Sequence, residues 1–246
     1  MSDGTERDAF VIATLFPSIL NTNGDAANAR VLAQRARWAG VANVSLIEVE
    51  HAKQMPRDVD FVVVGACSEP DVVRAHERLA AVQPALEAAG TAGVPVLAVG
   101  TGWYLLSQRF LTPGRSSEAG LGLFSGSASK RSQRISDDLV VDTAYGQLVG
   151  YENHSTDYRL GQGEKPLGTV AYGSGNGDGA EGALTGSLVG THLHGPILAR
   201  NPSFADHLLS RALERTGRTL PTSARAQEAD RFAANARSAV TTALGL

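Results

Sequence analysis

The sequence predicts an α/β protein built on a largely parallel central sheet, and three observations lead to this fold class. Short apolar runs lack the strict alternation of a half-exposed strand, which is typical of strands buried on both faces. Segments with apolar residues at helical spacing separate these runs, and glycine, proline or asparagine stand at the boundaries. Such alternation implies parallel strands joined by right-handed crossovers, with helices on both faces of the sheet.

The first half of the chain supplies these elements in order. Buried strands are expected at residues 9–16, 44–49, 61–64 and 94–99. Helices are expected at 29–39 before Gly40, from Val72 onward with a kink or restart at Pro84, and from Trp103 to Phe110. Residues 1–112 are therefore expected to form a doubly wound βα half.

The second half of the chain differs in composition and in its pattern of apolar residues. Residues 113–200 hold much of the glycine and short strand-like pieces such as 139–141 and 182–189. We expect this β-rich half to extend the same sheet. Two helices are expected to close the chain, at 202–216 with Asn201 as N-cap and at 224–243. The whole chain, 1–246, is expected to be a single domain.

Composition excludes several classes of function. The 22 basic and 25 acidic residues give a net charge of −3, which argues against a nucleic-acid-binding surface. No apolar run approaches the roughly 18 residues of a membrane span, and the start MSDGTERD lacks the pattern of a signal peptide. The single cysteine, Cys67, excludes an internal disulfide and fits a reducing compartment, so a cytoplasmic protein is expected.

Gly100-Thr101-Gly102 is the most informative turn in the sequence. A buried strand that runs into a tight glycine turn and then a helix has the order of a nucleophile elbow. In such an elbow the central side chain projects above the carboxyl edge of the sheet. The alternative is an ordinary connection between a strand and a helix.

Histidines and a glutamate further along are candidates for acid–base chemistry. His194 follows a strand-like run and could act as the general base for a thiol or hydroxyl nucleophile, or it could be structural. Glu152 and His154 are two residues apart, so an extended strand places them on one face. They could also be a metal pair, but two ligands without a third do not make a site, and no metal is predicted.

Four stretches of the chain, in this order and spacing, resemble a known family. They are residues 15–28, 98–106, 150–154 and 192–202, with sequences that include LFPSILN, AVGTGWYLL, GYENH and HLHGPIL. The chain resembles the glutamine amidotransferase subunits of lipid II isoglutaminyl synthases, in the CobB/CobQ-like class I group, over nearly its whole length. The resemblance implies a flavodoxin-like fold with no cofactor. It also implies a heterodimer with a separate ATP-dependent Mur-ligase-type subunit, which amidates the D-glutamate carboxyl of the peptidoglycan precursor with ammonia from glutamine.

Two departures from the family pattern fall on the reaction centre. The family has a nucleophilic cysteine followed by two glycines, and the alignment places Gly100 at the cysteine position. Glycine has no side chain to attack an amide carbonyl, although it tolerates the backbone angles of the turn. The family also has a run of glycines after the third strand, whose amides help to hold the oxyanion. This chain has Gly65, Ala66 and Cys67 there.

The remaining site residues are carried over by position. The resemblance places Arg134 near the glutamine pocket, with Arg131 as the fallback, while the alternative is that both belong to a solvated basic loop at 130–134. It retains His194 as the base, and Pro196 stands where other class I enzymes often have a glutamate. The predicted contacts to substrate come from Gly65, the amide of Thr101, Arg134, Glu152 and His154.

Three hypotheses follow for the function. The first is an amidotransferase-like subunit that has lost hydrolysis and serves a ligase as a structural or regulatory subunit. The second is an active glutaminase in which Cys67 is a displaced nucleophile and His194 its base, although a sulfur in the oxyanion loop would cost donors to the intermediate. The third is a different small-molecule activity on the same scaffold.

Overall fold

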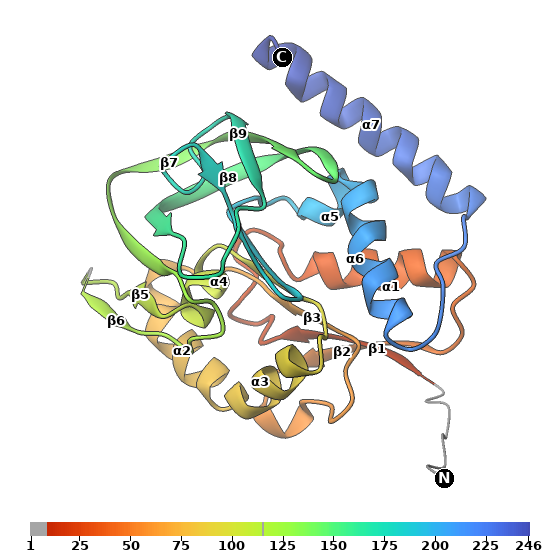
Figure 1. Cartoon of the computed structure of the whole chain (residues 1–246), viewed down its shortest axis with the longest axis horizontal. Helices are drawn as coiled ribbons and strands as arrows, with labels where there is room; N and C mark the ends of the chain where they lie inside the picture. Colours follow the sequence, from red (N-terminus) through yellow and green to blue (C-terminus); the bar gives the residue numbers. More distant parts are fainter. Residues whose placement is uncertain (1–8, 115) are drawn as a thin grey trace.

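A central sheet of six strands organises the molecule. The computed structural model describes residues 9–114 and 116–246, so the start MSDGTERD lies outside the described residues. The strand order is β11-β12-β4-β3-β1-β2 (Figure 1). The parallel strands are β1 (Phe10–Leu15), β2 (Val44–Val49), β3 (Phe61–Val64), β4 (Val96–Val99) and β12 (Leu188–Thr191). The strands expected in the first half are thus confirmed.

Alternate residues of the central strands enter two separate cores, which explains their continuous apolar character. In β3, Val62 and Val64 pack on one face with α2 (Val72–Ala80), α3 (Gln83–Thr91) and α4 (Thr101–Leu106). Phe61 and Val63 pack on the other face with α1 (Ala27–Trp38), α5 (Ile197–Arg200) and α6 (Pro202–Glu214). Helices therefore cover both faces, as predicted.

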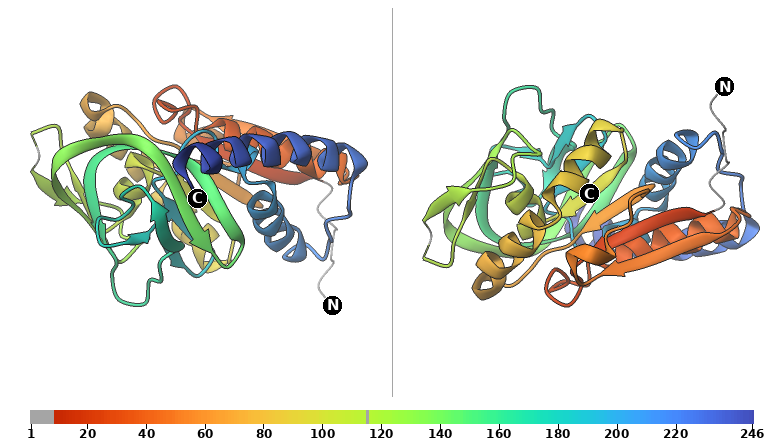
Figure 2. Two further views of the ribbon diagram at one scale, coloured as in Figure 1. Left: turned by 90° about the horizontal axis from the view of Figure 1, so that it is seen from above. Right: turned by 90° about the horizontal axis from the view of Figure 1, so that it is seen from below.

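The β-rich half extends the central sheet through β12 and the antiparallel strand β11 (Ala183–Thr185). Its other strands, together with β5 from the end of the first half, form a second sheet, in the order β10-β9-β7-β5-β6 with β8 paired to β7. These strands are β5 (Arg109–Leu111), β6 (Ser117–Ala119), β7 (Ser127–Thr143), β8 (Gly146–Arg159), β9 (Gly168–Tyr172) and β10 (Ala180–Glu181). The long hairpin of β7 and β8 arches beside the central sheet (Figures 1 and 2). Antiparallel strands joined by a short turn pair with each other first, so they need no place in the central sheet.

Two element predictions were wrong at their bounds. The helix expected at 103–110 begins at Thr101 and ends at Leu106, because residues 109–111 pair with β6 as a strand. The run 182–189 is the hairpin of β11 and β12, with Leu184 opposite Val189. Both runs are short and apolar, and short apolar runs do not distinguish helix from strand or one strand from two.

One alternative and one local prediction were also wrong. Residues 130–134, for which a solvated basic loop was the alternative, lie within β7, at an irregularity in its pairing with β8 between Lys130 and Ile135. Asn201 makes no side-chain cap for α6. Its amide instead bridges to β8, where Oδ1 accepts from the Val149 N–H and Nδ2 donates to the Val149 carbonyl, each at 2.9 Å. The Asn201 side chain thus binds the buried backbone of β8 and not the N-terminus of α6.

The last helix, α7 (Ala224–Leu244), lies along the outside of the molecule (Figure 1). Arg35 of α1 attaches it: its guanidinium is 5% exposed, binds Asp206 of α6 through two contacts of 2.6 Å, and binds Asp230 of α7 at 2.7 Å. Burial acts to lower the pKa of Arg35, but the two carboxylates outweigh it and raise that pKa. Within the described residues, no helix has the length and apolarity of a membrane span.

Replacing Arg35 with alanine is expected to lower the free energy of unfolding by about 2–3 kcal/mol, because charge-assisted hydrogen bonds to two helices are lost together. Chemical denaturation of both variants measures the effect. The matched control is Arg30→Ala, which removes an ion pair with Glu48 whose side chains are 70% and 50% exposed. That change is expected to stay within about 0.5 kcal/mol. Equal effects of the two substitutions would contradict this role of Arg35.

Candidate active site

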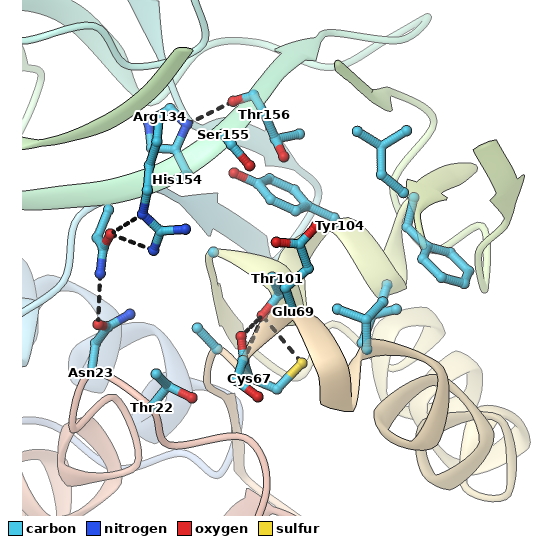
Figure 3. Close-up of a pocket in the computed structure, with 18 of the residues that line it drawn as sticks. Thr22, Asn23, Cys67, Glu69, Thr101, Tyr104, Arg134, His154, Ser155 and Thr156 are labelled. Carbon is cyan, nitrogen blue, oxygen red and sulfur yellow. Dashed lines mark hydrogen bonds between the residues drawn. The ribbon is translucent and has the colours of Figure 1, made fainter. Parts of the chain in front are cut away.

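A cavity of about 200 Å³ lies at the carboxyl ends of β3 and β4, where open α/β sheets bind their ligands. Its walls come from the loops after β1, β3 and β4, from α4 and β5, and from β7 and β8 (Figure 3). The polar residues that line it are Thr22, Asn23, Cys67, Ser68, Glu69, Thr101, Tyr104, Thr112, Arg134, Asn153, His154, Ser155, Thr156 and His194. Most of the residues predicted for the site are therefore brought together.

Gly100 forms the turn between β4 and α4 and has the geometry of a nucleophile elbow. Its backbone angles are φ 53° and ψ −124°, a conformation that side-chain-bearing residues rarely adopt. A Cβ at this position would lie 2.9 Å from His194 Cε1 and 3.3 Å from Nε2. It would also lie 3.2 Å from the Ala66 Cβ. The position faces the imidazole as a nucleophile would, but the imidazole and Ala66 pack around a residue without a side chain.

His194 is held by a carboxylate that the sequence analysis missed. The imidazole Nδ1 lies 3.0 and 3.2 Å from the two oxygens of Asp25, which is completely buried. A proton on Nδ1 donated to this carboxylate leaves Nε2, the nitrogen nearer Gly100, unprotonated, with the Asn23 amide 3.3 Å away as a donor to it. Asp25 comes from the loop after β1 and is distant in the sequence from both His194 and Pro196. It nevertheless lies within residues 15–28, one of the stretches that carry the family resemblance.

A polar chain leads from His194 to the rim of the cavity, and Figure 3 shows Asn23 and Arg134 along it. The Asn23 amide lies 3.2 and 3.3 Å from the two ring nitrogens of His194. Asn153 donates to the Asn23 oxygen at 3.5 Å and accepts from Arg134 at 2.7 and 3.1 Å. Arg134 therefore lines the cavity, whereas Arg131 binds Asp157 and Ser174. Asn23 and Asn153 are further residues that sequence reasoning did not single out.

The loop after β3 lies against the elbow through its backbone. The Ala66 N–H donates to Asp25 Oδ2 at 3.0 Å, and the Cys67 N–H donates to Thr101 Oγ1 at 2.6 Å. The Thr101 hydroxyl in turn donates to the Cys67 carbonyl at 3.1 Å. Gly65, the first residue of this loop, does not line the cavity and packs against the loop after β1, where a Cβ would be 2.2 Å from the Leu20 carbonyl oxygen. The backbone N–H groups of Ala66 and Cys67 are thus both hydrogen-bonded within the protein.

The Cys67 side chain lines the cavity in surroundings that disfavour its thiolate. Burial raises the pKa of Cys67 to about 11, and the nearby Thr101 hydroxyl offsets only part of this effect. The thiolate is the nucleophilic form, so little of it is present at neutral pH. The role of Cys67 as a displaced nucleophile stays a prediction.

Glu152 and His154 share a face of β8, as expected, and their side chains meet at 2.8 Å. Glu152 is completely buried and accepts hydrogen bonds from the amides of Ser174 at 2.6 Å and Gly175 at 3.0 Å. Glu152 therefore anchors the glycine-rich loop of residues 173–179 and does not line the cavity. His154 reaches the cavity wall, so a substrate contact remains a prediction for the histidine in particular.

A second buried glutamate–histidine pair stands beside the first. His192 Nδ1 lies 2.8 Å from Glu181, and the His192 ring lies 4.3 Å from the His154 ring. Burial lowers the pKa of His192. Burial acts to raise the pKa of Glu181, but its contacts with His192 outweigh this and lower it. Across residues 9–114 and 116–246, no three His, Cys, Asp or Glu side chains gather in a way that could hold a metal ion.

The crowding at the elbow predicts the cost of a side chain there. Gly100→Ala is expected to lower the free energy of unfolding by about 2–3 kcal/mol, because it combines a strained backbone with a contact to His194. Gly24→Ala is the control, since Gly24 also has a positive φ, 78°, but has open space around it. Its cost is expected to be about 1 kcal/mol. Thermal or chemical denaturation compares the two, and equal costs would show that the elbow accommodates a side chain.

The raised pKa of Cys67 predicts its reactivity. Because burial disfavours the thiolate, the rate of alkylation by iodoacetamide is expected to rise about tenfold per pH unit from pH 7 to pH 10, with no plateau below pH 10. Mass spectrometry follows the modification, and Cys67→Ala is the blank. A plateau near neutral pH would instead reveal an activated thiol.

Comparison with known proteins relates this site to one family. The model of the CobB/CobQ-like glutamine amidotransferase domain matches residues 12–202. Among curated proteins, lipid II isoglutaminyl synthase (glutamine-hydrolyzing) subunit GatD of Staphylococcus aureus (strain N315) is 32% identical over 204 residues, covering 80% of this chain and 82% of that protein. The subunit of the same name from Streptococcus pneumoniae (strain ATCC BAA-255 / R6) is 28% identical and covers 87% and 84%.

Solved structures agree in fold. A crystal structure of a glutamine amidotransferase covers 82% of this chain and 98% of its own, with a TM-score of 0.56 and 17% identity. A glutamine amidotransferase from Thermotoga maritima covers 96% and 94%, with a TM-score of 0.53 and 12% identity. The fold is therefore the flavodoxin-like fold of class I glutamine amidotransferases. The chain belongs to the CobB/CobQ-like glutamine amidotransferase family.

Proposed function

We propose that this protein is the amidotransferase-type subunit of a lipid II isoglutaminyl synthase and that it binds glutamine without hydrolysing it. The observation that carries this proposal is the elbow. Gly100 occupies the position that faces the base, and it offers no atom to attack an amide carbonyl. In the covalent route a thiolate attacks the amide carbon, the C–N bond breaks and ammonia leaves, so this route needs a side chain at the elbow.

The rest of the machinery supports glutamine as the ligand. His194 and Asp25 keep the arrangement of a base and its orienting carboxylate. Arg134 stands at the cavity rim, where its planar guanidinium suits the α-carboxylate of an amino acid. The Asn153 oxygen, at 2.7 Å, orients this guanidinium toward the cavity.

The names of the relatives support a pairing with a second subunit. Both GatD proteins are named as subunits of a synthase. By analogy, this chain pairs in the cytoplasm with a separate ATP-dependent Mur-ligase-type subunit, which amidates a peptidoglycan precursor. With its own nucleophile position empty, the chain contributes stability or regulation to the pair, and the ligase draws on another source of ammonia.

The second candidate function is an active glutaminase that uses Cys67, and the observation in its favour is that Cys67 and His194 line one cavity. The pH dependence of Cys67 alkylation tests its premise. A third candidate is the binding of another small molecule on the same scaffold. Glutamine calorimetry separates this third reading from the main proposal.

The experiment measures glutamine binding and glutamate release side by side, with and without a Mur-ligase-type partner. Wild type is expected to bind glutamine and to release no glutamate above the blank, and Cys67→Ala is expected to give the same result. Arg134→Ala is expected to weaken glutamine binding at least about tenfold, because a charge-assisted contact is lost. Arg131→Ala is the matched control, since Arg131 binds Asp157 and Ser174 instead.

Two results would overturn the proposal. Glutamate release by wild type that disappears in Cys67→Ala would identify a displaced nucleophile. Absence of glutamine binding, alone and with the partner, would favour a different ligand. Isolation of a stable complex with the partner subunit, by size-exclusion chromatography, tests the pairing separately.

A further inference from the structure

We propose that Thr101 holds the oxyanion loop in a closed state, so that hydrolysis is blocked at two positions rather than at Gly100 alone. The oxyanion loop is defined here as residues 65–67, directly after β3. This inference rests on the proposed function, because it concerns the same glutamine site. It assigns a positioning role to Thr101, which acts on the site through the loop.

One hydroxyl satisfies both backbone groups of Cys67. Thr101 Oγ1 accepts from the Cys67 N–H at 2.6 Å and donates to the Cys67 carbonyl at 3.1 Å. A hydroxyl has one proton to donate and lone pairs to accept, so both bonds form at once. The Cys67 amide therefore already has an acceptor within the protein.

The neighbouring amide is also engaged. The Ala66 N–H donates to Asp25 Oδ2 at 3.0 Å, and that carboxylate also orients His194. Breaking this bond would disturb the base, so the Ala66 amide is not free to serve an oxyanion. The Cys67 amide is the donor that can be released, and Thr101 is the residue that holds it.

Close packing leaves the loop little freedom to move away by itself. The first turn of α4 lies directly on the loop: a Cβ at Gly102 would be 2.2 Å from the Gly65 carbonyl oxygen and 2.9 Å from a methyl group of Val64. The helix and the loop can approach each other this closely only because Gly102 has no side chain. The loop and helix α4 are therefore expected to move as one body, with the Thr101 contact between them intact.

The consequence for chemistry follows from the requirements of acyl transfer. A tetrahedral intermediate needs N–H donors about 2.7–3.1 Å from its oxyanion, and each donor is worth about 10²–10³ in kcat. The Thr101 amide is free of intrahelical bonding, because it lies in the first turn of α4. A thiol introduced by Gly100→Cys would thus meet one donor, with the second still bound to Thr101.

The test uses three variants in a Cys67→Ala background, which retains the backbone N–H but removes the native thiol. They are Gly100→Cys, Gly100→Cys with Thr101→Ala, and Gly100→Cys with Thr101→Ser. Serine is the matched control because it keeps the hydroxyl. Glutamate release gives kcat and KM, calorimetry gives glutamine affinity, and iodoacetamide alkylation reports whether the introduced thiol is accessible.

Thr101→Ala is expected to raise the kcat of Gly100→Cys about 100-fold, with KM changed by less than about threefold, whereas Thr101→Ser gives no gain. Equal kcat in the variants with and without Thr101→Ala would overturn the role of Thr101. So would the same gain with serine, or silence in every variant that still binds glutamine and is alkylated. Loss of glutamine binding in every variant, and in wild type, would overturn the proposed function and this inference with it.

A second measurement needs neither activity nor the crowded Gly100→Cys variant. In the wild-type background, Thr101→Ala is expected to speed hydrogen exchange of the Cys67 amide at least tenfold, whereas Thr101→Ser leaves it slow. An unchanged exchange rate in Thr101→Ala would show that the hydroxyl does not hold this amide.

Discussion

The carboxylate of Asp25 connects the parts of this site. It lies in the loop after β1, accepts a hydrogen bond from the Ala66 amide after β3, and binds the imidazole of His194, which follows β12. Three loops that leave the same edge of the sheet are thereby tied to one buried group. A buried carboxylate needs such partners, because burial without them would favour its neutral form. The positions of the His194 imidazole and of the Ala66 amide therefore depend on the same residue.

The elbow keeps its backbone shape around a residue that has no side chain. The turn at Gly100 keeps the backbone angles of an elbow, and glycine adopts them without strain. The imidazole and Ala66 pack so closely around this position that a Cβ there would require them to shift. The hydroxyl of Thr101 binds a loop amide at the same place. The Asp25–His194 pair, the cavity and Arg134 are present, whereas the elbow position itself carries no side chain.

Behind the cavity, two glutamate–histidine pairs join the two sheets. Glu152 and His154 belong to β8 of the second sheet, and His192 follows β12 of the central sheet. The His154 and His192 rings lie 4.3 Å apart, and each has its own carboxylate partner. Glu152 also holds the glycine-rich loop through two amides. These contacts fix how the two sheets pack, although His192 Nε2 is buried without a hydrogen-bond partner among the described residues. The GYENH motif therefore makes mostly structural contacts.

The sequence by itself determined the parallel strands of the first half, the helices on both faces and the glycine turn between the fourth strand and its helix. These follow from local patterns: continuous apolar runs, helical spacing, and a glycine turn between strand and helix. It could not determine that residues 109–111 form a strand, that β5–β10 build a second sheet, or that Asn201 binds β8, because these depend on competition between distant partners. Asp25 is the clearest case. A carboxylate 169 residues before His194 becomes its partner only when the sheet brings the ends of β1 and β12 to one edge, and no local pattern records that distance. The same holds for Thr101 and Cys67, since a hydrogen bond between side chain and backbone 34 residues apart is a property of packing alone.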